Sequence, residues 1–151
     1  MAAKSTTGPA QPRHPLIEKA FASEVPVAAL IGFHVEEAGD GRSVLSFRAG
    51  PQHANPMGTL HGGVLCDVAD AAMGLAFATT LAPDESFTTV SLDINFFRPV
   101  WQATLRVEGR VVNRGKSSGY VECDVTDRDG RWIARAHSTC FVLRGEQAKG
   151  R

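Results

Sequence analysis

The sequence lacks the residues that mark several classes of protein. Its three cysteines, Cys66, Cys123 and Cys140, lie far apart and form no C-x-x-C pair, which argues against a disulfide framework. Basic and acidic residues number 16 each, so the net charge is zero and no basic surface for nucleic acid is indicated. The longest apolar run, residues 68–78, contains Asp70 and is too short to span a bilayer.

Other absences point the same way. The five histidines show no metal-ligand spacing, so we expect no metal. The N-terminal residues lack the apolar core of a secretory signal. We therefore expect a cytoplasmic protein that has neither nucleic acid nor a membrane as its partner.

The chain has the length of one domain, which we place at residues 26–144. Residues 1–25 should form an arm, disordered at first and then a short helix from Pro15. Residues 145–151 should be a frayed tail. One helix, about residues 62–80, is apolar almost all round, which is typical of a buried helix. The remaining segments alternate as strands do, at residues 32–38, 42–49, 86–97, 104–112, 120–126 and 132–143.

Tight turns between successive strands imply antiparallel pairing. A single buried helix with a mostly antiparallel sheet predicts an α+β domain in which the sheet wraps around the helix. In the strand at residues 86–97, Val90 and Phe96 should face the same side as Leu92 and Ile94, with Ser91 on the opposite face. A solvent-facing strand surface would also explain Ser91.

The most informative segment is residues 55–70, which carries an amide, an imidazole, two glycines and a carboxylate. Asp70 lies in apolar surroundings two turns into the helix, beyond the effect of the helix dipole, which favours a functional role. Gly62 can serve close packing, or its N–H at the helix start can bind a developing oxyanion. Asn55 can form a local turn before a proline or orient the reacting groups, and His61 can be structural or functional.

Helix geometry separates two of these residues. Gly62 and Asp70 are eight positions apart, which is about 12 Å along a helix at ~1.5 Å per residue. A carbonyl group bound at Gly62 is therefore out of reach of Asp70 in the same chain. If both residues act on one substrate, they come from different subunits, which predicts a dimer.

The spacing N-x5-H-G-G-x6-D, followed by V-S-L-D-I-N-F-F-R-P at residues 90–99, resembles the PaaI-type acyl-CoA thioesterases of phenylacetate degradation. It also resembles the Arthrobacter-type 4-hydroxybenzoyl-CoA thioesterases and the THEM2-like enzymes. The resemblance covers about residues 30–143. It implies a single hot-dog domain that hydrolyses an acyl-CoA. No cofactor is expected, because coenzyme A is part of the substrate. The protein should form at least a homodimer, and we expect a homotetramer built as a dimer of dimers.

The resemblance also implies site residues. Gly62 would supply the oxyanion contact, Asp70 would act as nucleophile or general base, Asn55 would orient the carboxylate or the water, and His61 would position the loop. Ser91 matches a water-holding serine. The hairpin turn of Arg114, Gly115, Lys116 and Ser117, and more weakly Arg98, would bind the phosphates of coenzyme A, although such a turn can also be merely solubilising.

Three questions stay open at this point. A hot-dog dehydratase or hydratase acting on acyl thioesters would also pair a histidine with an acid. A module that binds acyl-CoA without catalysis is the other alternative. The acyl group itself, aryl or medium-chain, is undetermined, with Met73, Phe77 and the Phe96–Phe97 pair as candidates for lining its pocket.

Overall fold

A computed structural model describes residues 13–23 and 25–151. Most of the arm expected to be disordered, residues 1–12, lies outside the described residues. The elements follow in the order α1 (Pro15–Phe21), α2 (Pro26–Ile31), β1 (Phe33–Gly39), β2 (Arg42–Ala49), a 3₁₀ turn (Pro51–His53), α3 (Gly62–Ala78), β3 (Ser86–Phe96), β4 (Ala103–Arg114), β5 (Ser118–Thr126), β6 (Trp132–Leu143) and a second 3₁₀ turn (Gly145–Ala148).

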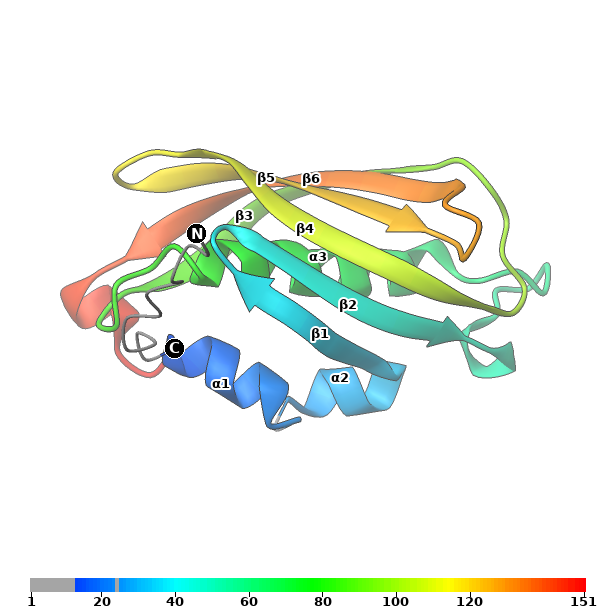
Figure 1. Cartoon of the computed structure of the whole chain (residues 1–151), viewed down its shortest axis with the longest axis horizontal. Coiled ribbons are helices and arrows are strands. Elements are labelled where there is room, and N and C mark those ends of the chain that lie inside the picture. Colours follow the sequence, from blue (N-terminus) through cyan, green and yellow to red (C-terminus); the bar gives the residue numbers. More distant parts are fainter. Residues whose placement is uncertain (1–12, 24) are drawn as a thin grey trace, which may run out of the picture.

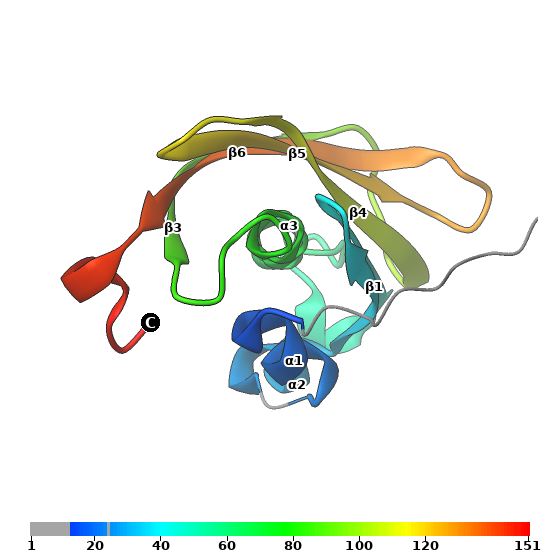
Figure 2. The ribbon, with the colours of Figure 1, turned by 60° about the vertical axis from the view of Figure 1, so that its left-hand side comes forward.

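The strands form one antiparallel sheet in the order β1-β2-β4-β5-β6-β3. This sheet arches around α3, as Figure 1 shows from the side and Figure 2 shows nearly along the helix axis. The order places β1 and β3 at the two edges, so among the described strands β3 pairs only with β6. The predicted α+β domain with a sheet wrapped around one central helix is confirmed.

The apolar side chains of α3 explain why the helix lies inside the sheet. Val68, Met73 and Phe77 are fully buried against it. Gly109 on β4 allows the closest approach, because a Cβ atom there would lie 2.5 Å from the carbonyl oxygen of Ala72. The Ser43 hydroxyl on β2 donates to that same carbonyl at 2.7 Å. Helix and sheet are therefore in backbone-level contact near the middle of α3.

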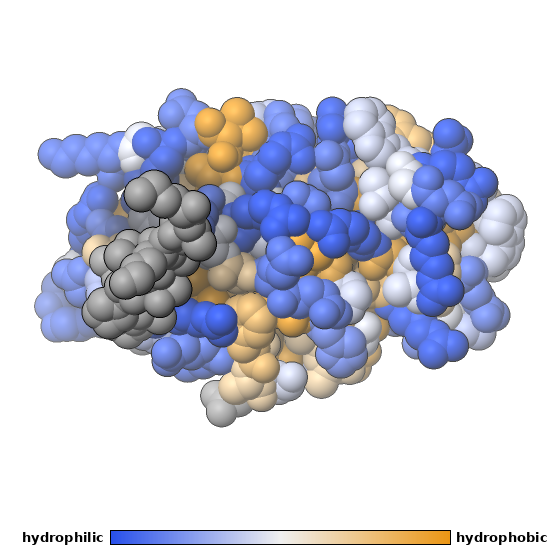
Figure 3. Space-filling model, viewed as in Figure 1, coloured by the Kyte–Doolittle hydropathy of each residue, from blue (hydrophilic) through white to orange (hydrophobic). Residues whose placement is uncertain are grey.

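The side of α3 that the sheet leaves open is covered by α1 and α2 (Figure 2). The helix expected from Pro15 is confirmed as α1, and the short apolar segment after Pro26 folds as the helix α2. Ile17 on α1 is buried, whereas Leu30 on α2 is 83% exposed. Figure 3 shows apolar surface along the lower margin of the molecule, where Figure 1 places these two helices.

Two details differ from the sequence-based expectations. A β-bulge between Thr89 and Ser91 shifts the register of β3 against β6, so that Val90 is half exposed instead of facing the helix with Leu92. Residues 145–148, expected to fray, form a 3₁₀ turn. In the part of the chain that the structure describes, no helix has the length and apolar character needed to cross a membrane.

Candidate active site

Asp70 lies in the middle of α3 on the side that faces β3, and its side chain is partly buried. The Thr89 hydroxyl on β3 donates a hydrogen bond to Asp70 Oδ1 at 3.0 Å. Burial raises the pKa of the Asp70 carboxyl, the bond from Thr89 opposes this rise, and the nearby Asp67 adds to it. The net result is a raised pKa. A partly desolvated carboxylate with one hydroxyl donor has the character of a general base or nucleophile.

Thr89 contacts Asp70 and is absent from the residues predicted for the site. Ser91, predicted to hold water, is exposed just beyond the bulge. A regular alternation over residues 86–97 cannot reveal the bulge. The signal that was available is the pair Thr88-Thr89 directly before it, since one of two adjacent strand residues must face the helix.

The start of α3 is organised by His61. Its Nδ1 atom accepts a hydrogen bond from the Gly63 N–H at 2.9 Å, so His61 caps the helix. The Gly62 N–H has no acceptor among the described residues. It is the first N–H of a 17-residue helix, where free donors and the helix dipole favour negative charge. The Phe96 ring packs so closely on Gly62 that a Cβ atom there would lie 2.8 Å from its Cζ.

The Asn55 side chain is held within its own loop. Its Oδ1 accepts hydrogen bonds from the N–H groups of Met57 at 2.9 Å and Thr59 at 3.2 Å, and its Nδ2 donates to the Thr59 hydroxyl at 2.9 Å. This is the local turn that the sequence left open as an alternative. Asn55 thus shapes the loop that leads to His61.

Gly62 and Asp70 do not meet within one chain. Gly62 and Asn55 border a cavity of about 390 Å³, together with the exposed Arg98 and the ring of Phe96. Asp70 borders a separate cavity of about 330 Å³, which lies along the C-terminal half of α3. The structure therefore keeps the proposed oxyanion donor and the proposed base apart, as their spacing on one helix requires.

The hairpin turn between β4 and β5 has mixed character. Arg114 is largely buried: its guanidinium lies 5.1 Å from the centre of the Phe77 ring and donates to the Thr80 hydroxyl at 3.1 Å. Gly115, Lys116 and Ser117 are exposed. Arg114 therefore ties the hairpin to the end of α3, while Lys116 and Ser117 remain accessible.

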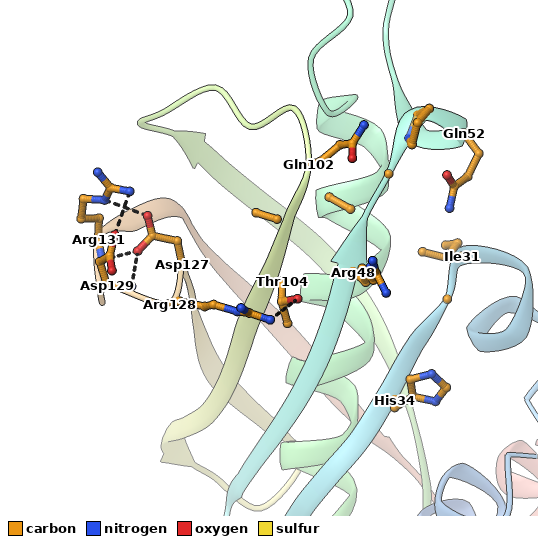
Figure 4. A pocket seen from close by; sticks show the side chains of 15 residues that line it. Ile31, His34, Arg48, Gln52, Gln102, Thr104, Asp127, Arg128, Asp129 and Arg131 are labelled. Carbon is orange, nitrogen blue, oxygen red and sulfur yellow. Dashed lines mark hydrogen bonds and ion pairs between the residues drawn. The ribbon is translucent and has the colours of Figure 1, made fainter.

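A larger hollow, about 870 Å³, lies elsewhere, between the start of β1, the end of β2 and the turn before β6. Figure 4 shows its two carboxylates, Asp127 and Asp129, both paired with Arg131, while Arg128 donates to the Thr104 hydroxyl. None of the predicted site residues borders it. With both acids neutralised by an arginine, it is a poorer candidate for catalysis than the Asp70 cavity.

Comparisons with known proteins agree with this fold. The family model described as "Thioesterase superfamily" matches residues 57–134. A Saccharolobus solfataricus protein named "Putative esterase" is 30% identical over 134 residues, 88% of this chain and 95% of its own length. A Listeria monocytogenes 1,4-dihydroxy-2-naphthoyl-CoA hydrolase is 23% identical, over 74% of this chain and 91% of its own.

Among solved structures, the E. coli PaaI protein from the phenylacetic acid degradation operon superposes with a TM-score of 0.76. It covers 86% of this chain and 93% of its own length at 20% identity, which supports the fold. The family match spans half of the sequence and includes Gly62, Asp70 and Thr89. The chain therefore belongs to the thioesterase superfamily and is an acyl-CoA thioesterase with the hot-dog fold.

Proposed function

We propose that this protein hydrolyses acyl-CoA at a site shared by two copies of the chain, with Gly62 of one copy and Asp70 of the other. The observation that carries the proposal is the placement of both residues on α3 beside opposite parts of β3. Thr89 near the start of β3 contacts Asp70, and Phe96 at its end packs on Gly62. A way to bring the two residues together follows from the free edge of that strand.

The free edge of β3 favours pairing with a second copy. This strand is 11 residues long, and Val90, Phe96 and the adjacent Phe97 are each about half exposed. A long apolar edge strand is an aggregation hazard unless it is covered. Antiparallel pairing of two β3 strands about a twofold axis would set the Thr89 end of one copy beside the Phe96 end of the other. Asp70 of each copy would then approach Gly62 of the other, in two equivalent sites.

The chemistry of such a site follows from its groups. The Gly62 N–H would donate to the thioester oxygen as negative charge develops on it. The Asp70 carboxylate would either attack the carbonyl carbon, expelling the coenzyme A thiolate and forming an anhydride that water then cleaves, or take a proton from an attacking water. In the second route the tetrahedral intermediate expels the thiolate, which takes up the proton. Both routes give a free acid and coenzyme A.

The remaining residues are proposed to position these groups. Asn55 and His61 would hold the loop before Gly62, and Asn55 would face the carboxylate of the second copy. Ser91 would hold water at the edge of β3. Lys116, Ser117 and Gly115 of the hairpin turn would contact the phosphates of coenzyme A, with Arg114 anchoring the turn and Arg98 contributing beside the Gly62 cavity.

The proposed chemistry requires neither a metal nor a cofactor. All three cysteines are free thiols, which supports a reducing location such as the cytoplasm. A dimer of dimers remains our proposal for the full assembly.

The test is the variant Asp70→Asn, which keeps the size of the side chain and an acceptor for Thr89. We expect turnover to fall by orders of magnitude on a panel of aryl, short and medium-chain acyl-CoA substrates, measured by release of free thiol. The dimer should persist in sedimentation experiments. Asp84→Asn, at an exposed acid in the turn before β3, is the matched control and should keep its activity. Turnover close to wild type in Asp70→Asn would rule out the proposed site.

A further inference from the structure

We infer that the cavity beside Asp70 holds the acyl group, and that α1 and α2 close it at a depth suited to uncharged arylacyl or medium-chain acyl groups. This inference rests on the proposed function. The cavity runs along α3 from Asp70 toward Ala78, between that helix, β1, β3 and the two N-terminal helices. Its polar side chains near Asp70 include Asp67 and Thr89. Leu16, Ala20, Ala28 and Phe33 line the part under the N-terminal helices.

The position of the carboxylate decides the orientation of the substrate. For Asp70 to act on the thioester, the carbonyl carbon must lie beside it. One substituent of that carbon, the coenzyme A, must then lead away to solvent. The other substituent needs an apolar space on the protein side, and the cavity that Asp70 borders supplies such a space.

The size of the cavity limits the acyl group. Its volume is about 330 Å³, roughly twice the ~150 Å³ that accommodates one benzene molecule in an engineered cavity. A phenylacyl group or a medium alkyl chain fits into this space, whereas a long fatty acyl chain would need the covering helices to move. The residues first suggested for the pocket, Met73 and Phe77, are fully buried on the sheet side of α3 and do not border the cavity.

The charge of the cavity limits the acyl group further. Asp67 and Asp70 both border it, and no lysine, arginine or histidine does so in the described part of the chain. A second carboxylate, as in a succinyl group, would be repelled and desolvated without a partner. The described side chains that line the cavity beneath α1 and α2 are apolar. Among them a hydroxyl on an aryl ring would find no partner, so it is disfavoured for the same reason.

The covering helices are anchored, so the depth of the cavity is fixed. His14 contacts the Glu85 carbonyl through Nε2 at 3.0 Å, and its Nδ1 accepts from the Leu16 N–H at 3.3 Å. The first contact holds the start of α1 against the turn before β3, and the second caps the helix. At the end of α2, the Ile31 carbonyl contacts Nε2 of the buried His53 at 2.8 Å.

The test fills the cavity from its cover. In Ala20→Phe, a ring enters the cavity from α1, and we expect the ratio of kcat/KM for octanoyl-CoA to that for acetyl-CoA to fall at least tenfold. Ala22→Phe is the matched control, because Ala22 is exposed at the end of α1 and does not border the cavity, so its ratio should stay that of the wild type. Ala28→Leu is a milder second variant from α2 and should shift the ratio in the same direction. An unchanged ratio in folded Ala20→Phe and Ala28→Leu would overturn the inference.

A binding measurement separates this inference from the proposed function. S-octyl-CoA, a thioether that cannot be hydrolysed, should bind the wild type in calorimetry and bind Ala20→Phe at least tenfold more weakly. If the wild type hydrolyses no thioester but shows this difference in binding, the proposed function fails and the pocket stands. If the wild type hydrolyses acyl-CoA and neither readout responds to Ala20→Phe, the pocket fails and the function stands. Preference for succinyl-CoA over octanoyl-CoA would also overturn the inference.

Discussion

The Thr89 hydroxyl lies 3.0 Å from Asp70 Oδ1 and joins the middle of α3 to β3 directly before the bulge of that strand. The same hydroxyl lies 4.0 Å from Cys140 Sγ on β6. Because the Thr89 hydroxyl donates a hydrogen bond to Asp70, it stabilises the ionised carboxylate within a partly desolvated site. The bulge is thus placed where the strand supports the candidate base.

Removal of this hydroxyl should change the pH dependence of catalysis. In Thr89→Val the pKa of Asp70, already raised by burial, should rise further because the bond that opposes the rise is lost. Since the ionised form is the active one, the acid limb of the kcat/KM profile should move to higher pH, with part of the lost activity recovered in alkaline buffer. Thr88→Val, at the adjacent residue opposite Phe141, is the control. A profile that falls equally at all pH values would assign Thr89 a purely structural role.

Replacement of the carboxylate should stabilise the fold at neutral pH. The folded-state pKa of Asp70 lies above its ordinary value of 3.8, so the folded state binds the proton more tightly than the unfolded state does. The stability associated with this group is therefore full below pH 3.8 and is lost as the pH rises through the folded-state pKa. Asp70→Asn avoids that loss and should be more resistant to urea than the wild type at pH 7, with the difference vanishing near pH 3.5. A variant that is less stable at pH 7 would contradict the assignment of a strained, functional charge.

Periodicity and turn residues were enough to predict the framework. The strand at residues 132–143 was predicted with its observed bounds, and the helix from Gly62 was predicted to within two residues of its end. In both segments the apolar residues of the sequence pattern are the ones that become buried, so local preference and tertiary packing agree. For the same reason, a single helix without a polar face was enough to predict that the sheet wraps around it.

The details that the sequence did not reveal depend on contacts between distant segments. The bulge at Val90 shifts the alternation of β3, and the hydroxyl of Thr89 directly before it reaches Asp70. Arg114 was grouped with Lys116 as a phosphate ligand, and its packing on Phe77 depends on the position of the end of α3. The closure of the cavity beside Asp70 likewise depends on where α1 and α2 pack, and no local sequence pattern reveals this.

Substitutions of the two cations of the hairpin turn, Arg114 and Lys116, should have different effects. Arg114→Ala loses the contact with Phe77 and the hydrogen bond to Thr80, and should lower the free energy of unfolding by about 1–2 kcal/mol. Lys116→Ala should leave the melting temperature unchanged and raise KM for acyl-CoA by about tenfold, an effect that weakens as salt is added. Equal effects of both changes on KM, with no loss of stability, would assign Arg114 to the phosphates as well.

The oxyanion contact can be tested at Gly62 without disturbing the helix. Gly62 is the first residue of α3, and the preceding His61 has φ −65° and ψ 131°, a conformation compatible with a following proline. Gly62→Pro removes the N–H and should reduce kcat by about 10²–10³-fold, the usual loss for one oxyanion donor. Gly62→Ala is the matched control, since it meets the same Phe96 ring but keeps the N–H. Equal losses in both variants would attribute the effect to crowding by Phe96.

Mixed dimers test whether the site is shared. In a heterodimer purified with two tags, one chain carries Asp70→Asn and the other carries Gly62→Pro. If each site takes Gly62 from one chain and Asp70 from the other, one site is intact and the second carries both changes, so activity should return to about half that of the wild-type dimer. If each site lay within one chain, both would carry a change and the heterodimer would be as inactive as the two parent variants. Because neither parent has an intact site in either arrangement, recovered activity can come only from residues contributed across the interface.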